Sequence, residues 1–213
     1  MKARFLEVNF EVKSKGIIIG QRIKGGVFRP VIDHIPSSTV EGMFRNILNI
    51  NVKGFGIFNE YEIREFTYSV RDKMLNFSKM PITTQYIKTN GGKIYILKED
   101  QKTELIENLV GKTMYLGGLK SKGFGKIKIV GVNEVDEGKL IGIQGKLVAN
   151  IYLEYVDPFE IKVISPIYGY LIKGTGFLGN GLYRNLKYIK SLMKNSIVKA
   201  PKILIEEETY YDE

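Results

Sequence analysis

One stretch with helical periodicity, set between strand-like runs, constrains the fold more than any other feature of this sequence. In the segment SSTVEGMFRNIL, apolar side chains recur at the spacing of one helix face, and the stripe consists of Val40, Met43, Phe44, Ile47 and Leu48. Ser38 and Glu41 have the spacing of a capping box, and Pro36 stands just before it. The sequence therefore predicts an amphipathic helix over about residues 38–48, with Arg45 off its apolar stripe.

The patterns around this helix predict an α+β fold. Their order along the chain is strand, helix, strand, strand, helix, loop and strand, which is the RRM or ferredoxin-like βαββαβ arrangement. The strands are expected over about 3–13, 61–71, 82–98 and 126–132, and the second helix over 102–110. A loop around NFSKMP is expected to join the two middle strands.

The sequence changes character after about residue 133. Long β-like runs follow, with a glycine-rich loop expected in GTGFLGNG and a short helix expected in LYRNLKYIKSLMKN, whose apolar residues have helical spacing. No low-complexity linker separates the two parts, so the second is expected to pack on the first. We predict an RRM-like core over residues 1–132 and a smaller, mostly β C-terminal region over residues 133–213.

Positive charge is segregated along the chain. The formal net charge is +9, and five lysines stand between Glu107 and Glu134 without a carboxylate among them. Eight basic residues stand between Glu160 and Glu206, again without an acidic residue. Blocks of one sign favour a polyanion as partner, because each neutralised phosphate releases counterions. The charge pattern therefore predicts a nucleic-acid surface, provided that the blocks face the same way in the folded protein.

The residue types that are missing narrow the possible chemistry. The 213 residues include no cysteine and one histidine, His34, so disulfides, thiolate metal sites and His-rich zinc sites are excluded. No apolar run approaches the roughly 18 residues that span a membrane, and the N-terminus alternates like a strand rather than a signal peptide. We expect a cytoplasmic protein with no metal, no cofactor and no membrane partner.

A glycine-rich, positively charged loop precedes the last strand of the expected core. Glycine permits a tight backbone with exposed N–H groups, which binds anions, and Lys120 and Lys122 lie on one side if the loop is extended. Phe124 is either a ring that stacks on a base or a plug in the core, and the loop itself is either an RNA clamp or a solvated turn. The residues of this loop predicted to bind RNA are Gly117, Gly118, Lys120, Ser121, Lys122, Gly123, Phe124 and Lys126.

Two familiar nucleotide-binding motifs do not fit this loop. A Walker A loop ends in Gly-Lys-Ser/Thr at the start of a helix, and the dinucleotide fingerprint connects a strand to a helix. Here the alternating run KIKIVGV, typical of a strand, follows the loop. The sequence therefore argues against an NTPase and against a dinucleotide-dependent enzyme.

Three segments resemble the CRISPR-associated RAMP superfamily. The loop GGLKSKGFGK is similar to the signature loop of that superfamily, and IPSSTVEGMFRNIL is similar to its first-helix segment. The Ser-Thr form of the latter is most like the subunits that hold the 5′ handle of crRNA, the five-group of Cas proteins including their type III versions. The segments SPIYGYLIKGTGFLGNGLYRNL and NSIVKAPKIL resemble the C-terminal part of such subunits.

The resemblance implies a non-catalytic, RNA-binding scaffold subunit of a CRISPR ribonucleoprotein complex for antiviral defence. Its partners would be crRNA, the large subunit and a backbone RAMP subunit. RNA contacts are then expected at the N-terminus of the first helix, where free N–H groups meet a phosphate, although capping accounts for the same residues. The further residues predicted to bind RNA are Ser37, Ser38, Thr39, Arg45, Arg22, Lys24 and Arg29.

Three alternative functions stay open. A RAMP-type endoribonuclease that processes CRISPR repeat RNA would need a general acid or base, and His34 is the one imidazole. A type III backbone subunit that cleaves target RNA would use an aspartate in the loop before the first helix, but Phe28 or a neighbour stands there, and Asp33 corresponds to a non-catalytic position. An RRM-like module outside CRISPR would have aromatic RNP motifs, which this sequence lacks. We therefore expect this chain to be a scaffold rather than an enzyme.

Overall fold

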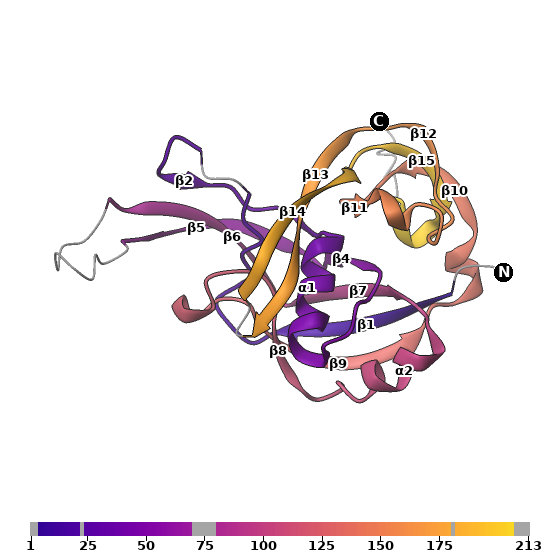
Figure 1. Ribbon diagram of the computed structural model, residues 1–213, viewed down its shortest axis with the longest axis horizontal. Helices are drawn as coiled ribbons and strands as arrows, with labels where there is room; N and C mark the ends of the chain where they lie inside the picture. The colour runs from indigo at the N-terminus through magenta and orange to yellow at the C-terminus, as the bar shows by residue number, and fades with distance from the viewer. Residues whose placement is uncertain (1–3, 22–23, 70–79, 180–181, 207–213) are drawn as a thin grey trace.

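The computed structural model describes residues 4–21, 24–69, 80–179 and 182–206. Within these ranges the protein is α+β and consists mostly of strands, with two α-helices (Figure 1). The helices are α1 (Ser37–Leu48) and α2 (Asp100–Glu107). The strands are β1 (Phe5–Val12), β2 (Phe28–Arg29), β3 (His34–Ile35), β4 (Gly54–Phe58), β5 (Tyr61–Tyr68), β6 (Ile82–Thr89), β7 (Gly91–Leu97), β8 (Thr113–Tyr115), β9 (Lys126–Glu134), β10 (Gly142–Lys146), β11 (Ile151–Tyr152), β12 (Lys162–Ser165), β13 (Tyr168–Gly179), β14 (Leu182–Leu192) and β15 (Ile197–Pro201).

The largest sheet of the described residues has six strands in the order β3-β4-β7-β1-β9-β8. All of its neighbouring strands are antiparallel. Side chains alternate between its faces, so that Leu6 and Val8 of β1 join one hydrophobic cluster while Phe5 joins another. The sheet is therefore buried on both sides.

The first cluster fills the space between this sheet and the two helices. Val40 and Phe44 of α1 and Ile106 of α2 are fully buried there, together with Ile94 of β7 and Ile127 of β9. The predicted apolar stripe of the first helix is confirmed by burial at Val40, Met43 and Phe44, whereas Leu48 is half-buried and Ile47, in the last turn, is 40% exposed.

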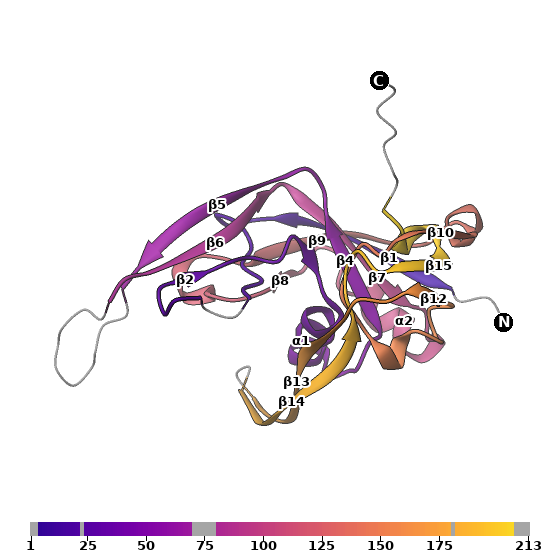
Figure 2. The same ribbon diagram turned by 90° about the horizontal axis from the view of Figure 1, so that it is seen from above.

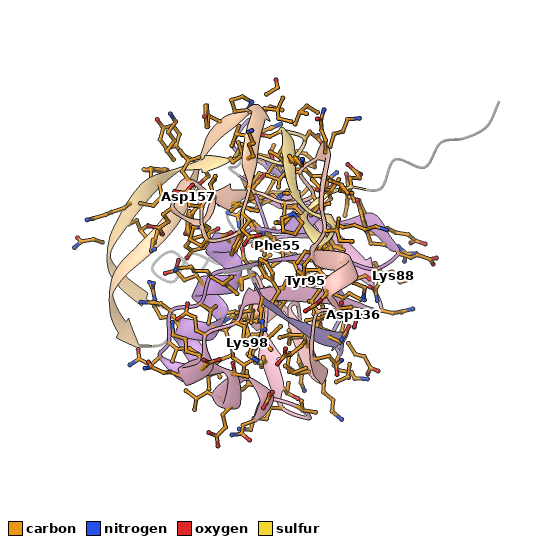
Figure 3. All side chains as sticks on the ribbon, turned by 90° about the vertical axis from the view of Figure 1, so that its right-hand side faces the viewer. Phe55, Lys88, Tyr95, Lys98, Asp136 and Asp157 are labelled. Carbon is orange, nitrogen blue, oxygen red and sulfur yellow. The ribbon has the colours of Figure 1, made fainter. Side chains whose placement is uncertain are left out.

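The second cluster joins the opposite face of the sheet to the C-terminal part of the chain. Phe55 of β4 stacks on Tyr95 of β7 with ring centroids 5.3 Å apart, and Figure 3 shows the two rings side by side. Phe5 and Phe159 meet edge to face at 5.2 Å. Residues of the C-terminal part and of the sheet therefore share one hydrophobic cluster.

The predicted capping box at the start of α1 is wrong. The helix begins at Ser37 with Pro36 at the N-cap position, and no side chain caps it. Glu41, the expected reciprocal cap, is buried in a hydrogen-bonded cluster with residues of the C-terminal part. The helix ends at Leu48, and the C-cap residue Asn49 has a left-handed φ of 53° and donates its N–H to the carbonyl of Arg45.

Two hairpins extend the molecule beyond the main sheet. The strands β5 and β6 form a long antiparallel hairpin that projects from the body, with β2 paired beside β6 (Figure 2). The predicted strand over 82–98 is in fact two strands, β6 and β7, which belong to different sheets. Of the loop predicted around NFSKMP, residues 76–79 lie outside the described residues.

The second hairpin, β13–β14, corrects two expectations. The helix expected in residues 182–195 is wrong, because most of these residues form β14, and the expected glycine-rich loop of GTGFLGNG includes the end of β13. The physical reason is long-range pairing, since β14 forms an antiparallel ladder with β13 from Leu192 to Leu182. Apolar residues at alternate positions, such as Leu186 and Tyr188, also suit a strand.

Candidate nucleic-acid interface

The glycine-rich loop between β8 and β9 is fixed at its base by backbone hydrogen bonds. Gly118 donates its N–H to the carbonyl of Ile18 at 2.7 Å, and Gly125 donates to the carbonyl of Gly16 at 2.9 Å. Gly117 has a φ of 80°, and a Cβ added to it would lie 2.3 Å from the oxygen of Ile18. Glycine is therefore required at Gly117, because the backbone is left-handed and another segment of the chain passes too close for a side chain.

The tip of the loop is a 3-10 turn rather than an extended segment. Lys120, Ser121 and Lys122 form this turn and are exposed. Since residues two apart in such a turn point in different directions, Lys120 and Lys122 do not share one side as the extended form would require. The Lys120 ammonium lies over the ring of Tyr115 at 5.6 Å. The turn still presents two ammonium groups to solvent, with backbone N–H groups at its start that have no partner within the turn.

Phe124 lies inside the protein, where its ring joins the loop to the β5–β6 hairpin. Its side chain is 1% exposed and meets Phe66 at 5.1 Å and Tyr86 at 5.2 Å, measured between ring centroids. No face of the ring is open to a base, so the expected stacking role is replaced by its alternative, a core plug. Unlike Phe124, the neighbouring loop residues Gly123 and Lys126 are exposed to solvent.

The N-terminus of α1 is covered by the C-terminal part of the chain. Ser37 is completely buried, and its N–H donates to the carbonyl of Asn150 at 3.1 Å. Its position contradicts the predicted RNA contact at Ser37, since both its side chain and its N–H are enclosed by protein. Ser38 and Thr39 are half-buried.

Arg45 is held within the protein by a buried polar cluster. Its guanidinium donates to the carbonyl of Gly174 in β13 at 2.6 Å and forms an ion pair with Glu41. The Glu41 carboxylate also accepts from the Tyr155 hydroxyl at 3.2 Å and lies 3.3 Å from the Lys173 ammonium. Burial raises the pKa of the Tyr155 hydroxyl, and the Glu41 carboxylate raises it further. Each guanidinium nitrogen of Arg45 already donates to a protein partner, the Nε to Asn51, and the bond to Gly174 ties α1 to the β13–β14 hairpin, which argues against an RNA contact at Arg45.

The basic loop before α1 is only partly described. Arg22 lies outside the described residues, while Lys24 is exposed in a small hairpin next to β2. Arg29 of β2 is half-buried, and its Nε is enclosed without a hydrogen-bond partner in the described structure. Ile17, in the segment on which the glycine-rich loop rests, pairs with Ile87 of β6. The loop, β2 and β6 are therefore connected through one run of backbone contacts.

His34 and Asp33 occupy a closed ion-pair network. His34 is 5% exposed, with Nδ1 at 2.9 Å from Asp33 Oδ1, and its Nε2 is also enclosed. Asp33 Oδ2 accepts from the Lys194 ammonium at 2.8 Å and from the Tyr61 hydroxyl at 3.3 Å. The hydrogen bond with His34, joined by the Lys194 ammonium, holds the pKa of the Asp33 carboxyl far below its usual range despite partial burial. Both side chains are therefore engaged with protein partners.

Two functional candidates were missed by the sequence patterns. Lys15 lies over the ring of Phe66 at 5.7 Å, and Tyr115 lies under Lys120. The absence of acidic residues between Glu11 and Asp33 was a signal for Lys15, but no local pattern places it beside a hairpin more than about fifty residues away. Among the described residues no group of three or more His, Cys, Asp or Glu side chains is arranged to hold a metal ion, and none of the helices is long and apolar enough to span a membrane.

Comparison with known proteins shows the fold of this chain but not its family. No family model and no curated protein matches the sequence. A chain in the cryo-EM structure of the Type III-B Cmr-beta bound to cognate target RNA and AMPPnP, state 1, matches with a TM-score of 0.54 and 12% identity, over 91% of this chain and 86% of that chain. A chain in the structure of the same complex bound to cognate target RNA gives a TM-score of 0.48 and 14% identity, over 92% and 86% of the two chains. The first match shows that the fold is shared over nearly the whole length.

Proposed function

We propose that this chain is an RNA-binding subunit of a CRISPR effector complex and that it contacts crRNA through the loop between β8 and β9. The observation that carries this proposal is a turn with exposed Lys120, Ser121 and Lys122 on a backbone fixed by Gly117, Gly118 and Gly125. A fixed turn with two ammonium groups suits a phosphate chain, because little conformational entropy is lost on binding. The fold shared with a chain of an RNA-bound type III-B complex supports the same assignment.

The order of strands supports an RRM-like core of the RAMP kind. The inner strands β4-β7-β1-β9 of the main sheet follow the chain order β1-α1-β4-β7-α2-β9, which has the βαββαβ form. In this assignment the core covers residues 1–132, the β-rich C-terminal region covers residues 133–213, and the glycine-rich loop follows the second helix of the core.

We further infer that this chain is a non-catalytic subunit that binds the 5′ handle of crRNA and contacts the large subunit and a backbone subunit of the complex. The enclosure of His34 and the ion pair of Asp33 with Lys194 support the absence of acid–base catalysis by these two residues. The cluster that fixes Arg45 and the burial of Ser37 argue against RNA contacts at these two positions, while Lys120, Ser121 and Lys122 are exposed.

The double substitution Lys120→Ala and Lys122→Ala tests this proposal. Binding to a fluorescein-labelled, single-stranded RNA with a CRISPR repeat handle is measured by fluorescence anisotropy at several salt concentrations. We expect weaker binding, and a slope of log K against log salt that is smaller by about 0.7 for each phosphate that the protein no longer neutralises, or about 1.4 for two phosphates. Unchanged affinity and slope would refute the loop as an RNA contact.

A matched control removes the same charge elsewhere. Lys162 and Lys199 are exposed and face each other across β12 and β15. Their double alanine variant keeps the loop intact and should retain the wild-type affinity within about twofold. Sequencing the RNA that co-purifies with the full-length protein then tests the finer assignment, which requires enrichment of crRNA with an intact 5′ handle.

A further inference from the structure

The β13–β14 hairpin exposes an apolar face that the described part of the chain does not cover. Residues opposite each other in an antiparallel pair share a face, and the register pairs Tyr170 with Lys190 and Ile172 with Tyr188. Tyr170 is 65% exposed and Tyr188 is 73% exposed. The exposed apolar side chains of this outward face are Tyr168, Tyr170, Ile172, Leu186 and Tyr188.

The opposite face of the hairpin is anchored on the protein. Leu171 is buried, and Lys173 forms an ion pair with Glu154 at 2.8 Å in addition to its contact with Glu41. The carbonyl of Gly174 accepts from Arg45 of α1, and Figure 1 shows the two strands running past this helix. The outward tyrosines are therefore carried by a strand pair with a fixed position, so that a ligand would not have to order the hairpin.

The charge on the hairpin indicates which ligand this face suits. The chain has no acidic residue from 161 to 205. Lys190 shares the outward face and lies over the ring of Tyr168 at 4.3 Å, while Lys187 is exposed on the same strand. An apolar face also suits a protein partner, but the unbalanced positive charge beside open rings favours a polyanion with aromatic bases.

The positions of the two open rings also suit a nucleic-acid strand. Tyr170 and Tyr188 stand on adjacent strands, two register positions apart, and such diagonal neighbours lie about 7–8 Å from each other. Ile172, opposite Tyr188, and Leu186, the next outward residue on β14, extend the apolar surface. Each ring can therefore take one base of the same strand.

We propose that the outward face of the β13–β14 hairpin is a base-stacking site for single-stranded RNA, in which Tyr170 and Tyr188 stack on bases and Lys190 neutralises the backbone. This site is separate from the loop between β8 and β9, and its assignment rests on the proposed function only in requiring that the chain meets RNA. It adds contacts to bases, whereas the loop supplies contacts to phosphates.

The test compares two RNA probes that carry the same charge. One is a fluorescein-labelled single-stranded uridine oligomer of about 20 nucleotides, long enough to span an extended binding surface. The other has the same length but abasic sugars at alternate positions. The full-length protein should bind the first probe more tightly. Tyr170→Ala and Tyr188→Ala should each weaken that binding about tenfold, because one stacked base is lost. The double variant should lose its preference for bases while its salt slope stays at the wild-type value, since the phosphates remain neutralised.

Conservative and distant substitutions serve as controls. The variant with Tyr170→Phe and Tyr188→Phe keeps both rings and should bind like the wild type. Ile141 is 60% exposed and lies outside the hairpin, so Ile141→Ala should change nothing. Circular dichroism and thermal melting establish that each variant is folded.

Each outcome separates this proposal from the loop assignment. Equal binding of both probes by the wild type, or wild-type affinity of the double tyrosine variant, would overturn the stacking site without affecting the result for Lys120 and Lys122. Loss of binding in the tyrosine variant but not in the lysine variant would support the hairpin and reject the loop. If the tyrosine variant binds RNA normally but abolishes self-association in sedimentation velocity, the face is a protein interface and the RNA proposal is wrong.

Discussion

Replacement of Phe124 distinguishes a ring that supports the glycine-rich loop from a ring that contacts RNA. Phe124 is enclosed by Phe66 and Tyr86, and truncation of a buried phenylalanine to alanine costs about 3–5 kcal/mol of folding free energy. Part of that cost comes from two aromatic pairs, each worth about 0.5–1.5 kcal/mol beyond buried area. For a chain of this length, the corresponding fall in Tm is about 6–20 °C.

Phe124→Leu provides the decisive comparison. Leucine keeps most of the buried volume but loses both aromatic pairs, so its cost should be about 1–3 kcal/mol, less than that of alanine. If Phe124 only plugs the base of the loop, this variant binds the handle RNA within about twofold of the wild type. If the ring stacked on a base, leucine would lose about 1–3 kcal/mol of binding, or about 5- to 150-fold in affinity.

Two measurements on the same samples complete the test. Thermal melting followed by circular dichroism gives the stability, and fluorescence anisotropy with the handle RNA gives the affinity. Ile141→Ala, which removes an exposed apolar side chain away from the loop, is the control for RNA binding. A Phe124→Leu variant that melts like the wild type but binds RNA at least about tenfold more weakly would refute the interpretation as a plug.

Two further predictions concern the loop backbone and the ion pair at Asp33. Gly117→Ala should lower the Tm more than Gly123→Ala. Both glycines have a left-handed φ, which alone costs about 1–2 kcal/mol for alanine, but only at Gly117 would the added Cβ meet a backbone oxygen. Equal losses of Tm in the two variants would contradict the crowding argument. Asp33→Asn should lower the urea midpoint at pH 7. The folded state lowers the pKa of the Asp33 carboxyl, so its ion pair with Lys194 stabilises the protein at pH values above the ordinary pKa of about 3.9. The wild type loses this stabilisation as the pH falls from about 4 towards the lowered pKa. The difference in urea midpoint between the two proteins should therefore be smaller at about pH 3, and a constant difference would contradict the stabilising ion pair.

Local periodicity predicted those elements whose apolar residues repeat with the period of the element itself. Val40, Met43 and Phe44 of α1 recur on one helix face, and Leu6, Val8 and Phe10 of β1 alternate toward one cluster, although the strand partners of β1 are far along the chain. The sequence did not distinguish a strand from a helix at β14, because the apolar residues of this segment fit both helical and strand spacing. Pairing with β13 decided between them, and no short window contains that pairing.

The candidate site was predictable in composition but not in geometry. The glycines and lysines of the loop identified an exposed, positive segment, yet its 3-10 turn is held in place by hydrogen bonds with Gly16 and Ile18, in the segment that follows β1. Phe124 is buried because rings from β5 and β6 reach it. Long-range contacts of this kind leave no periodic signal in the sequence.

The cluster around Glu41 constrains how the sequence of this protein can change. Glu41 and Tyr155 are 114 positions apart, and Arg45 and Gly174 are 129 apart, yet they share one enclosed set of charges and hydrogen bonds. Loss of Arg45 or Lys173 leaves the buried Glu41 carboxylate with fewer partners, whereas joint replacement by apolar residues of similar size is far less damaging. Divergent relatives should therefore exchange Glu41, Arg45 and Lys173 together, so that paired substitutions in α1 and in the β13–β14 hairpin record their contact.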